Sequence, residues 1–92
     1  MLIVKKFGGS SVADRERIYN VAKRCIEDYR KGHDVVVVLS AMGDTTDDLI
    51  ALAQSINPEP KKRELDMLMT TGEQVSVSLM AMAMHAMDVP AV

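Results

Sequence analysis

Cysteine and long apolar runs are both scarce in this sequence, and each scarcity excludes a class of protein. The 92 residues include one cysteine, Cys25, so no internal disulfide can form, and a reducing cytoplasm is the simplest compartment. The longest apolar run, 79–84, falls far short of the roughly 20 residues that a helix needs to span a bilayer. The apolar run at 1–4 is likewise too short for a signal peptide.

The sequence also lacks an excess of charge of one sign. Charged residues make up 26% of it, yet the net charge is only −2, which leaves no basic surface for a nucleic acid or an anionic membrane. Aromatic residues amount to 3%, whereas methionine occurs eight times, mostly between 67 and 87. A methionine-rich helix more often fills a core or a subunit contact than binds a cofactor. The length suits one small domain.

The apolar pattern of the first 39 residues predicts a strand, a helix and a second strand. Leu2–Val4 is a short apolar run that is soon followed by two glycines, which is typical of a buried strand. Between about 13 and 31 apolar residues recur at helical spacing, with Ser11 or Asp14 as the N-terminal cap. The run 35–39 has no polar alternation, which predicts a strand covered on both faces, as in a parallel sheet.

The remaining residues predict two more helices and the opening of a third strand. One helix is expected at 45–56, and a longer one from about 61 to 87, with a kink or a fresh N-terminus at Gly72. Because 75–87 is apolar nearly all round, this part should be buried on several sides. The last residues, 89–92, read as a third strand without a partner helix. We therefore expect the chain to be a fragment of a longer α/β protein.

The first candidate site is the loop Lys6–Ser11, which follows the first strand. Gly8 and Gly9 carry no Cβ, so their backbone N–H groups can approach a phosphate closely, and Lys6 adds a positive charge just before them. A helix N-terminus, which attracts anions, is expected next. This combination predicts an anion cradle, although it is not the Walker pattern, in which the lysine follows the glycines. A tight turn beside a solvated lysine explains the loop, taken alone, equally well.

Two further segments carry candidate ligand groups. The loop Ser40–Asp47 is rich in hydroxyls and opens a helix, where hydroxyls and free N–H groups can hold a carboxylate or phosphate oxygen. Its alternative reading is that Thr45 or Thr46 caps the helix. In Thr70–Glu73 a carboxylate beside a glycine can hold an ammonium group. The alternative there is an acidic residue in the first turn of a helix.

Three other polar residues are expected to serve packing or to lie at the surface. His33 and His85 are isolated from other candidate groups, and Cys25 lies on the apolar face of the first helix. No metal ligands are predicted.

Taken together, in this order and at this spacing, the three segments resemble a known family. Lys6–Ser11 resembles the N-terminal signature of aspartokinases, Ser40–Asp47 resembles their second loop, and Thr71–Glu73 resembles their third. The resemblance covers all 92 residues, although members of the family are several times longer. Glutamate 5-kinases and acetylglutamate kinases carry related glycine loops but not this set of three.

The resemblance implies an enzyme that uses ATP and Mg²⁺ to phosphorylate the side-chain carboxylate of L-aspartate. This reaction is the first step of lysine, threonine and methionine biosynthesis. The implied fold is a parallel-sheet, three-layer α/β/α sandwich of the amino-acid kinase type. Residues 1–92 would form the N-terminal part of its catalytic domain, with the regulatory domains absent. A cytoplasmic homo-oligomer is implied for the full-length protein, and the 92 residues alone are expected to be inactive or nearly so.

The resemblance also implies roles for individual residues. Lys6 would be the catalytic residue and would contact the transferring phosphate. Nucleotide binding is implied for five residues of the first two segments: Lys6, Gly8, Gly9, Ser10 and Ser40. Thr45 and Thr46 would bind the aspartate carboxylate, and Glu73 would bind its ammonium group. No general base is expected, because the aspartate side chain is already ionised at neutral pH.

Two other functions stay open. The chain could belong to another amino-acid kinase that acts on glutamate or a related acid. It could also be a non-catalytic phosphate-binding or interaction module, for which the apolar helix at 75–87 would suit a partner surface.

Overall fold

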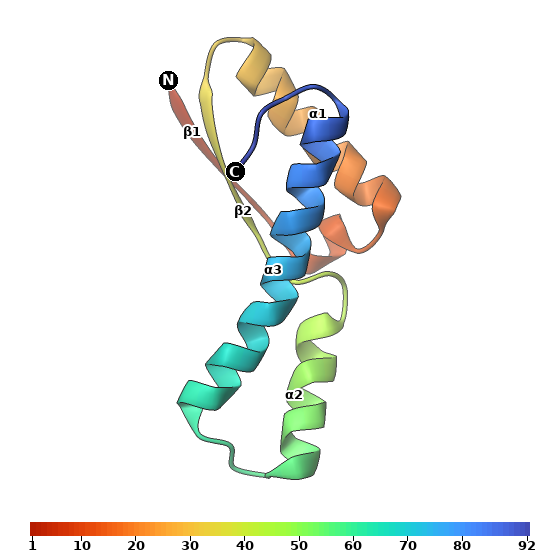
Figure 1. Ribbon diagram of the computed structural model, residues 1–92, viewed down its shortest axis with the longest axis vertical. Coiled ribbons are helices and arrows are strands. Elements are labelled where there is room, and N and C mark those ends of the chain that lie inside the picture. Colours follow the sequence, from red (N-terminus) through yellow and green to blue (C-terminus); the bar gives the residue numbers. More distant parts are fainter.

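The computed structural model describes residues 1–92 and contains a two-stranded sheet, three α-helices and a short 3₁₀ helix (Figure 1). The first half is the strand, helix and second strand that the apolar pattern predicts, and two helices follow. In chain order the elements are β1 (Leu2–Phe7), η1 (Gly9–Val12), α1 (Arg15–Arg30), β2 (Asp34–Leu39), α2 (Thr45–Ile56) and α3 (Lys62–Ala86).

The sheet pairs β1 with β2 in parallel, in a register that runs from Leu2 opposite Asp34 to Phe7 opposite Leu39. A parallel sheet places the carboxyl ends of its strands at one edge, so the loops that follow β1 and β2 start side by side. The parallel sheet and the α/β class are confirmed.

One face of the sheet is bare, because α1 and α3 both lie on the other face (Figure 1). Val36 and Val38 are 47% and 44% exposed, whereas Leu39 points to the helices and is buried. The expectation that the second strand is covered on both faces is therefore wrong for these residues. The described residues form two layers, one of strands and one of helices.

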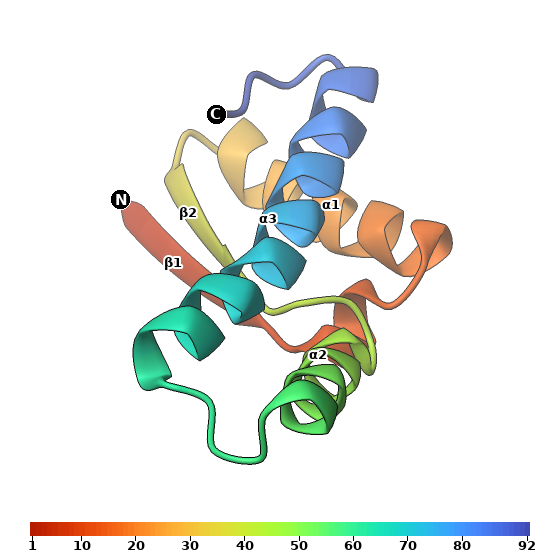
Figure 2. The ribbon, with the colours of Figure 1, turned by 60° about the horizontal axis from the view of Figure 1, so that its bottom comes forward.

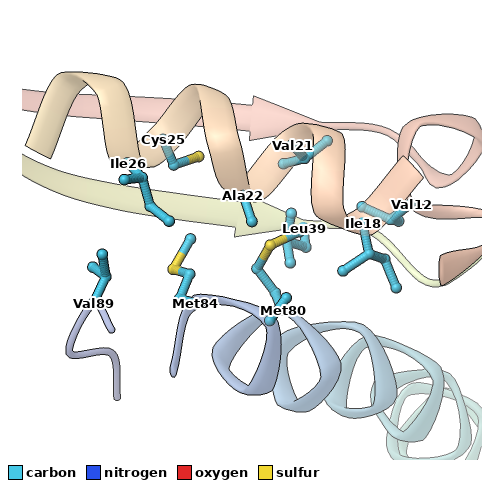
Figure 3. Close-up of a cluster of buried hydrophobic side chains, with 11 residues drawn as sticks. Val12, Ile18, Val21, Ala22, Cys25, Ile26, Leu39, Met80, Met84 and Val89 are labelled. Atoms are coloured by element: carbon cyan, nitrogen blue, oxygen red, sulfur yellow. The ribbon is translucent and has the colours of Figure 1, made fainter. Parts of the chain in front are cut away.

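The core lies between α1, α3 and the end of β2 (Figure 3). The N-terminus of α1 is fixed by Asp14, whose side chain accepts a hydrogen bond of 2.9 Å from the backbone N–H of Arg17. Side chains of α1 and α3 point towards one another across this core (Figure 3). Eleven buried residues form the cluster: Val12, Ile18, Val21, Ala22, Cys25, Ile26, Leu39, Met80, Ala83, Met84 and Val89.

Helix α3 differs from its prediction in two respects. It runs without interruption through Gly72, so the prediction of a fresh N-terminus at that position is wrong. The expectation of burial on several sides is also wrong. Val75 and Met82 are 51% and 62% exposed, because only one side of α3 meets α1 and the sheet. Five residues at helical spacing make up the buried side: Gly72, Ser76, Met80, Ala83 and Met84.

The last four residues form no strand, which contradicts the prediction of a third one. The N–H group of Val89 donates to the carbonyl of Met84 (3.0 Å), and its side chain is buried in the core. No neighbouring strand is present to pair with this segment.

Helix α2 and the first half of α3 form a helical pair that extends beyond the sheet (Figure 1). α2 contains no buried residue, and Ile56 near its end is 81% exposed. The molecule is therefore elongated, with extents of 49 × 25 × 17 Å. None of its helices is both long and apolar enough to cross a membrane.

Candidate functional site

The loops that follow β1 and β2 touch at the carboxyl edge of the sheet (Figure 2). The N–H group of Ser40 donates to the carbonyl of Phe7 (3.2 Å), and that of Gly43 donates to the carbonyl of Gly9 (2.9 Å). A Cβ atom on Gly9 would lie 2.7 Å from the carbonyl oxygen of Ala41 and 3.0 Å from that of Gly43. Position 9 therefore has no room for a side chain, because backbone from the second loop fills that space.

Gly8 stands in different surroundings. A Cβ atom on this residue would meet nothing within 4 Å, and its backbone is extended (φ −78°, ψ 174°). The space beside Gly8 is therefore open to a ligand, whereas the space beside Gly9 is occupied by the protein itself.

The helix predicted at about 13–31 is present, with Asp14, one of the two predicted caps, at its start, but its N-terminus is not available to an anion as expected. Gly9–Val12 forms only a 3₁₀ turn, and α1 begins at Arg15 with its N-terminus capped by Asp14. The N-terminus of α1 is thus already occupied by a carboxylate, so its dipole is not free to attract a phosphate at the glycine loop. A guanidinium lies close to the loop instead, because Arg17 Nη1 donates to the carbonyl of Ser10 (2.8 Å).

The N-terminus of α2 remains uncapped. Asp44 occupies the cap position, and no side chain there hydrogen-bonds to the helix backbone. Thr45 and Thr46 are the first two helical residues, so the reading in which one of them caps the helix is wrong. The hydroxyl groups of these two half-buried threonines and the backbone N–H groups of Thr46 and Asp47 are therefore candidates for ligand binding, whereas the N–H group of Thr45 already donates to the carbonyl of Met42 (3.0 Å).

Helix α3 passes directly against the second loop at Gly72. A Cβ atom on Gly72 would lie 3.0 Å from Ala41 Cβ, 3.2 Å from Thr45 Cγ2 and 3.6 Å from Leu49 Cδ1. The next residue, Glu73, lies in the interior of α3, is exposed and makes no ion pair. Its position excludes the reading as a first-turn acidic residue that stabilises a helix N-terminus.

The two lysines of β1 lie on opposite faces of the sheet. Lys5 faces α1 and pairs with Asp28; this hydrogen bond raises the pKa of Lys5 and lowers that of Asp28. Successive side chains of a strand point to opposite faces, so Lys6 lies on the face without helices. It is exposed there and makes no ion pair with any residue. Lys5 therefore joins β1 to α1, while the ammonium group of Lys6 is free to meet a ligand.

The structure brings the three predicted segments together around one edge of the sheet. Gly9 contacts Ala41 and Gly43, and Gly72 contacts Ala41 and Thr45. Lys6 and Glu73 lie near this edge because they are close in sequence to Gly8 and Gly72, and they form no ion pair with each other. The role of Ala41, which lies between two glycines, was missed by the sequence analysis; a glycine inside an otherwise apolar helix was the available signal.

Other polar residues stay apart from this edge. His85 Nε2 lies 2.9 Å from the carbonyl oxygen of Ala91, and burial raises the pKa of the Cys25 thiol. Nowhere do three His, Cys, Asp or Glu side chains gather in a way that could hold a metal ion.

Comparisons of this sequence with a family model and with curated proteins agree with each other. The model of a family described as the amino acid kinase family matches residues 1–92. The aspartokinase of Bacillus sp. (strain MGA3) is 63% identical over 84 residues, which make up 91% of this chain and 20% of that protein. The aspartokinase of Thermus thermophilus is 59% identical over 90 residues, 98% of this chain and 22% of that protein. The chain thus spans about a fifth of the length of these curated relatives.

A solved structure supports the same grouping. The crystal structure of aspartate kinase from Synechocystis superposes on the whole of this chain with a TM-score of 0.97 and 52% sequence identity. The matched region is 16% of that chain.

Proposed function

Because the chain belongs to the amino acid kinase family, we propose that it is the first part of the catalytic domain of an aspartokinase. Such an enzyme transfers the γ-phosphate of ATP to the side-chain carboxylate of L-aspartate. The observation that carries the proposal is the meeting of the glycine loop, the hydroxyl-rich loop and α3 at one sheet edge. Identities of 57–63% to curated aspartokinases support it.

The proposed reaction needs charge compensation more than proton transfer. An oxygen of the aspartate carboxylate attacks the γ-phosphorus, the bond to the β,γ-bridging oxygen breaks, and ADP leaves with that electron pair. The nucleophile is ionised at neutral pH, so no base has to activate it. The barrier arises largely from the approach of an anion to a polyanion, which fixed positive charges and aligned N–H groups relieve.

The roles of the residues follow from this requirement. The free ammonium group of Lys6 contacts the transferring phosphate. Gly8, which borders open space, and the backbones of Gly9 and Ser10 contact the phosphates, with Ser40 nearby. On the aspartate side, the uncapped start of α2 presents Thr45 and Thr46 to a carboxylate. The unpaired carboxylate of Glu73 binds the aspartate ammonium group.

Mg²⁺ fits the site as a companion of the nucleotide. No acidic cluster in the chain resembles a protein cage for it, and Mg²⁺ commonly keeps water and phosphate oxygens as ligands. When bound to the phosphates, the ion would neutralise part of their charge.

The wider setting is also part of the proposal. We infer a cytoplasmic enzyme of lysine, threonine and methionine biosynthesis, which acts as a homo-oligomer and carries its regulatory domains beyond these residues. On its own, the 92-residue chain is expected to be nearly inactive.

The test uses the complete enzyme, by which we mean residues 1–92 joined to the remainder of an aspartokinase. That remainder is either the gene's own continuation or the matching part of the Thermus thermophilus relative. Lys6→Ala should lower kcat by at least a hundredfold and leave the unfolding midpoint unchanged, because the exposed Lys6 side chain makes no ion pair that its loss would break. Lys23→Ala, at an exposed lysine of α1, is the matched control.

The outcomes separate the proposal from its alternatives. A kcat of Lys6→Ala equal to that of the control would refute the phosphate role of Lys6. Phosphorylation of glutamate in preference to aspartate would assign the site to another amino-acid kinase. No phosphorylation of either acid by the unmodified complete enzyme would favour a non-catalytic module.

A further inference from the structure

Gly72 has an energetic cost that local structure does not explain. Glycine in a helix interior destabilises the helix by roughly 0.5–1 kcal/mol relative to alanine, and Gly72 lies well inside α3. Its φ angle is not positive, so no turn or strained conformation requires glycine here. A requirement from outside the helix must therefore offset the cost.

That requirement is the close approach of α3 to the second loop. With a Cβ atom at position 72, the contacts of 3.0 Å to Ala41 Cβ and 3.2 Å to Thr45 Cγ2 would both be tighter than ordinary van der Waals contact. Ala41 cannot easily retreat, because it is 3% exposed and its carbonyl oxygen already fills the space beside Gly9. A side chain at 72 would thus push on a residue held from both sides.

Thr45 is the second residue that such a side chain would displace. Its Cγ2 atom faces α3 at Gly72, so the hydroxyl takes a different staggered position around the same Cβ. Threonine is stiff at χ1, so a push on Cγ2 turns the hydroxyl or shifts the first turn of α2. Glu73 follows Gly72 directly, so the same contact sets the distance between α3's carboxylate and the threonine.

We propose that Gly72 is a positioning residue that holds the Thr45 hydroxyl and the Glu73 carboxylate at the spacing aspartate requires. The proposal rests on the proposed function, in which these two residues bind aspartate. Gly72 does not touch the substrate; it acts because a hydrogen in place of a side chain lets α3 lie directly against Ala41 and Thr45.

The test is a cycle of substitutions in the complete enzyme, measured by steady-state kinetics with aspartate and ATP varied separately. Gly72→Ala should raise KM for aspartate about tenfold, which corresponds to about 1.4 kcal/mol, and leave KM for ATP within twofold. The same substitution in a background of Ala41→Gly and Thr45→Ser, which lacks both contacting methyl groups, should change KM for aspartate less than twofold relative to that background. Gln74→Ala, at an exposed neighbour on α3, is the control.

Each outcome decides the proposal. It is overturned if Gly72→Ala leaves KM for aspartate within twofold, raises both KM values equally, or has the same effect in both backgrounds. Should Gly72→Ala alone not fold, a folded triple variant with the background's KM supports the proposal, and an unfolded triple variant overturns it. Thr45→Val, which keeps the shape and removes the hydroxyl, tests the proposed function separately: an unchanged KM for aspartate would refute the role of Thr45 itself.

Discussion

Replacement of Gly8 and Gly9 by alanine, one at a time, should give opposite effects on stability. The two residues are adjacent, and neither has a positive φ angle, so alanine fits the backbone conformation at both. They differ in what a Cβ atom would meet. At Gly9 it would lie 2.7 Å from the carbonyl oxygen of Ala41, whereas at Gly8 it would meet nothing within 4 Å.

The magnitudes follow from these contacts. Overpacking against backbone costs about 1–3 kcal/mol, and the lower entropy of the unfolded alanine variant returns about 0.4–1 kcal/mol. Gly9→Ala should therefore lower the free energy of unfolding by up to about 2.6 kcal/mol, because the Ala41 oxygen cannot rotate away and the hydrogen bond from Gly43 to Gly9 must stretch. Gly8→Ala should raise the free energy of unfolding by up to about 1 kcal/mol, because only the lower entropy of the unfolded chain acts there.

Thermal unfolding of the complete enzyme, followed by calorimetry, measures the difference. At about 2–4 °C per kcal/mol, Gly9→Ala should lower the midpoint of the catalytic domain by up to roughly 10 °C, and Gly8→Ala should keep or raise it. KM for ATP should nevertheless rise in Gly8→Ala, because the added methyl group enters the space proposed for phosphate. Equal midpoints for the two variants would refute the assignment of Gly9 to a contact within the protein and of Gly8 to the ligand.

Three further predictions concern single side chains. Glu73→Gln should raise KM for aspartate about 10–100-fold and leave KM for ATP unchanged, because a charge-assisted hydrogen bond is worth about 1.5–3 kcal/mol. The control Glu64→Gln, at an exposed residue of the same helix, should change neither KM. A selective loss of ATP binding in Glu73→Gln would show that Glu73 is misassigned. Ser76→Ala should keep or raise the unfolding midpoint, because the buried Ser76 hydroxyl has no hydrogen-bond partner, and a drop of several degrees would reveal a hidden one. The pKa of Asp28 is lowered and that of Lys5 raised by their ion pair, so the pair stabilises the fold above the ordinary carboxyl pKa of 3.8 and below the ordinary lysine pKa of 10.5. Asp28→Asn should therefore lower the unfolding midpoint at pH 7. The midpoints of the variant and of the unmodified protein should converge as the pH falls well below 3.8, and an equal difference between them at pH 7 and at low pH would contradict this account.

The sequence predicted the elements that depend on local pattern. The strand, helix and strand of the first half follow from uninterrupted apolar runs and from helical spacing, and the predicted bounds of α2, 45–56, agree with the structure. Gly72 was misread, because a glycine lowers helix propensity, and propensity takes no account of the packing that holds α3 together through this position. The exposure of Val36 and Val75 could not be predicted either. Apolar residues indicate that a surface is suited to burial, but no helix or strand of the 92 residues covers Val36 or Val75.

The candidate site was predictable in outline only. The carboxyl ends of parallel strands share an edge, so the meeting of the first two loops followed from the apolar pattern alone. The contacts of Gly9 and Gly72 with Ala41 depend on distances between elements, which a single sequence does not specify. The capping of α1 by Asp14 was among the predicted options, but the 3₁₀ turn that separates α1 from the glycine loop was not.

A crystal structure of the complete enzyme with aspartate and a non-hydrolysable ATP analogue measures the central claim directly. Our account predicts that the terminal phosphate lies within about 2.7–3.2 Å of Lys6 Nζ, beside the open space at Gly8, with the aspartate carboxylate at the start of α2. Phosphates bound elsewhere, or a Lys6 ammonium group paired with a protein carboxylate instead, would contradict it.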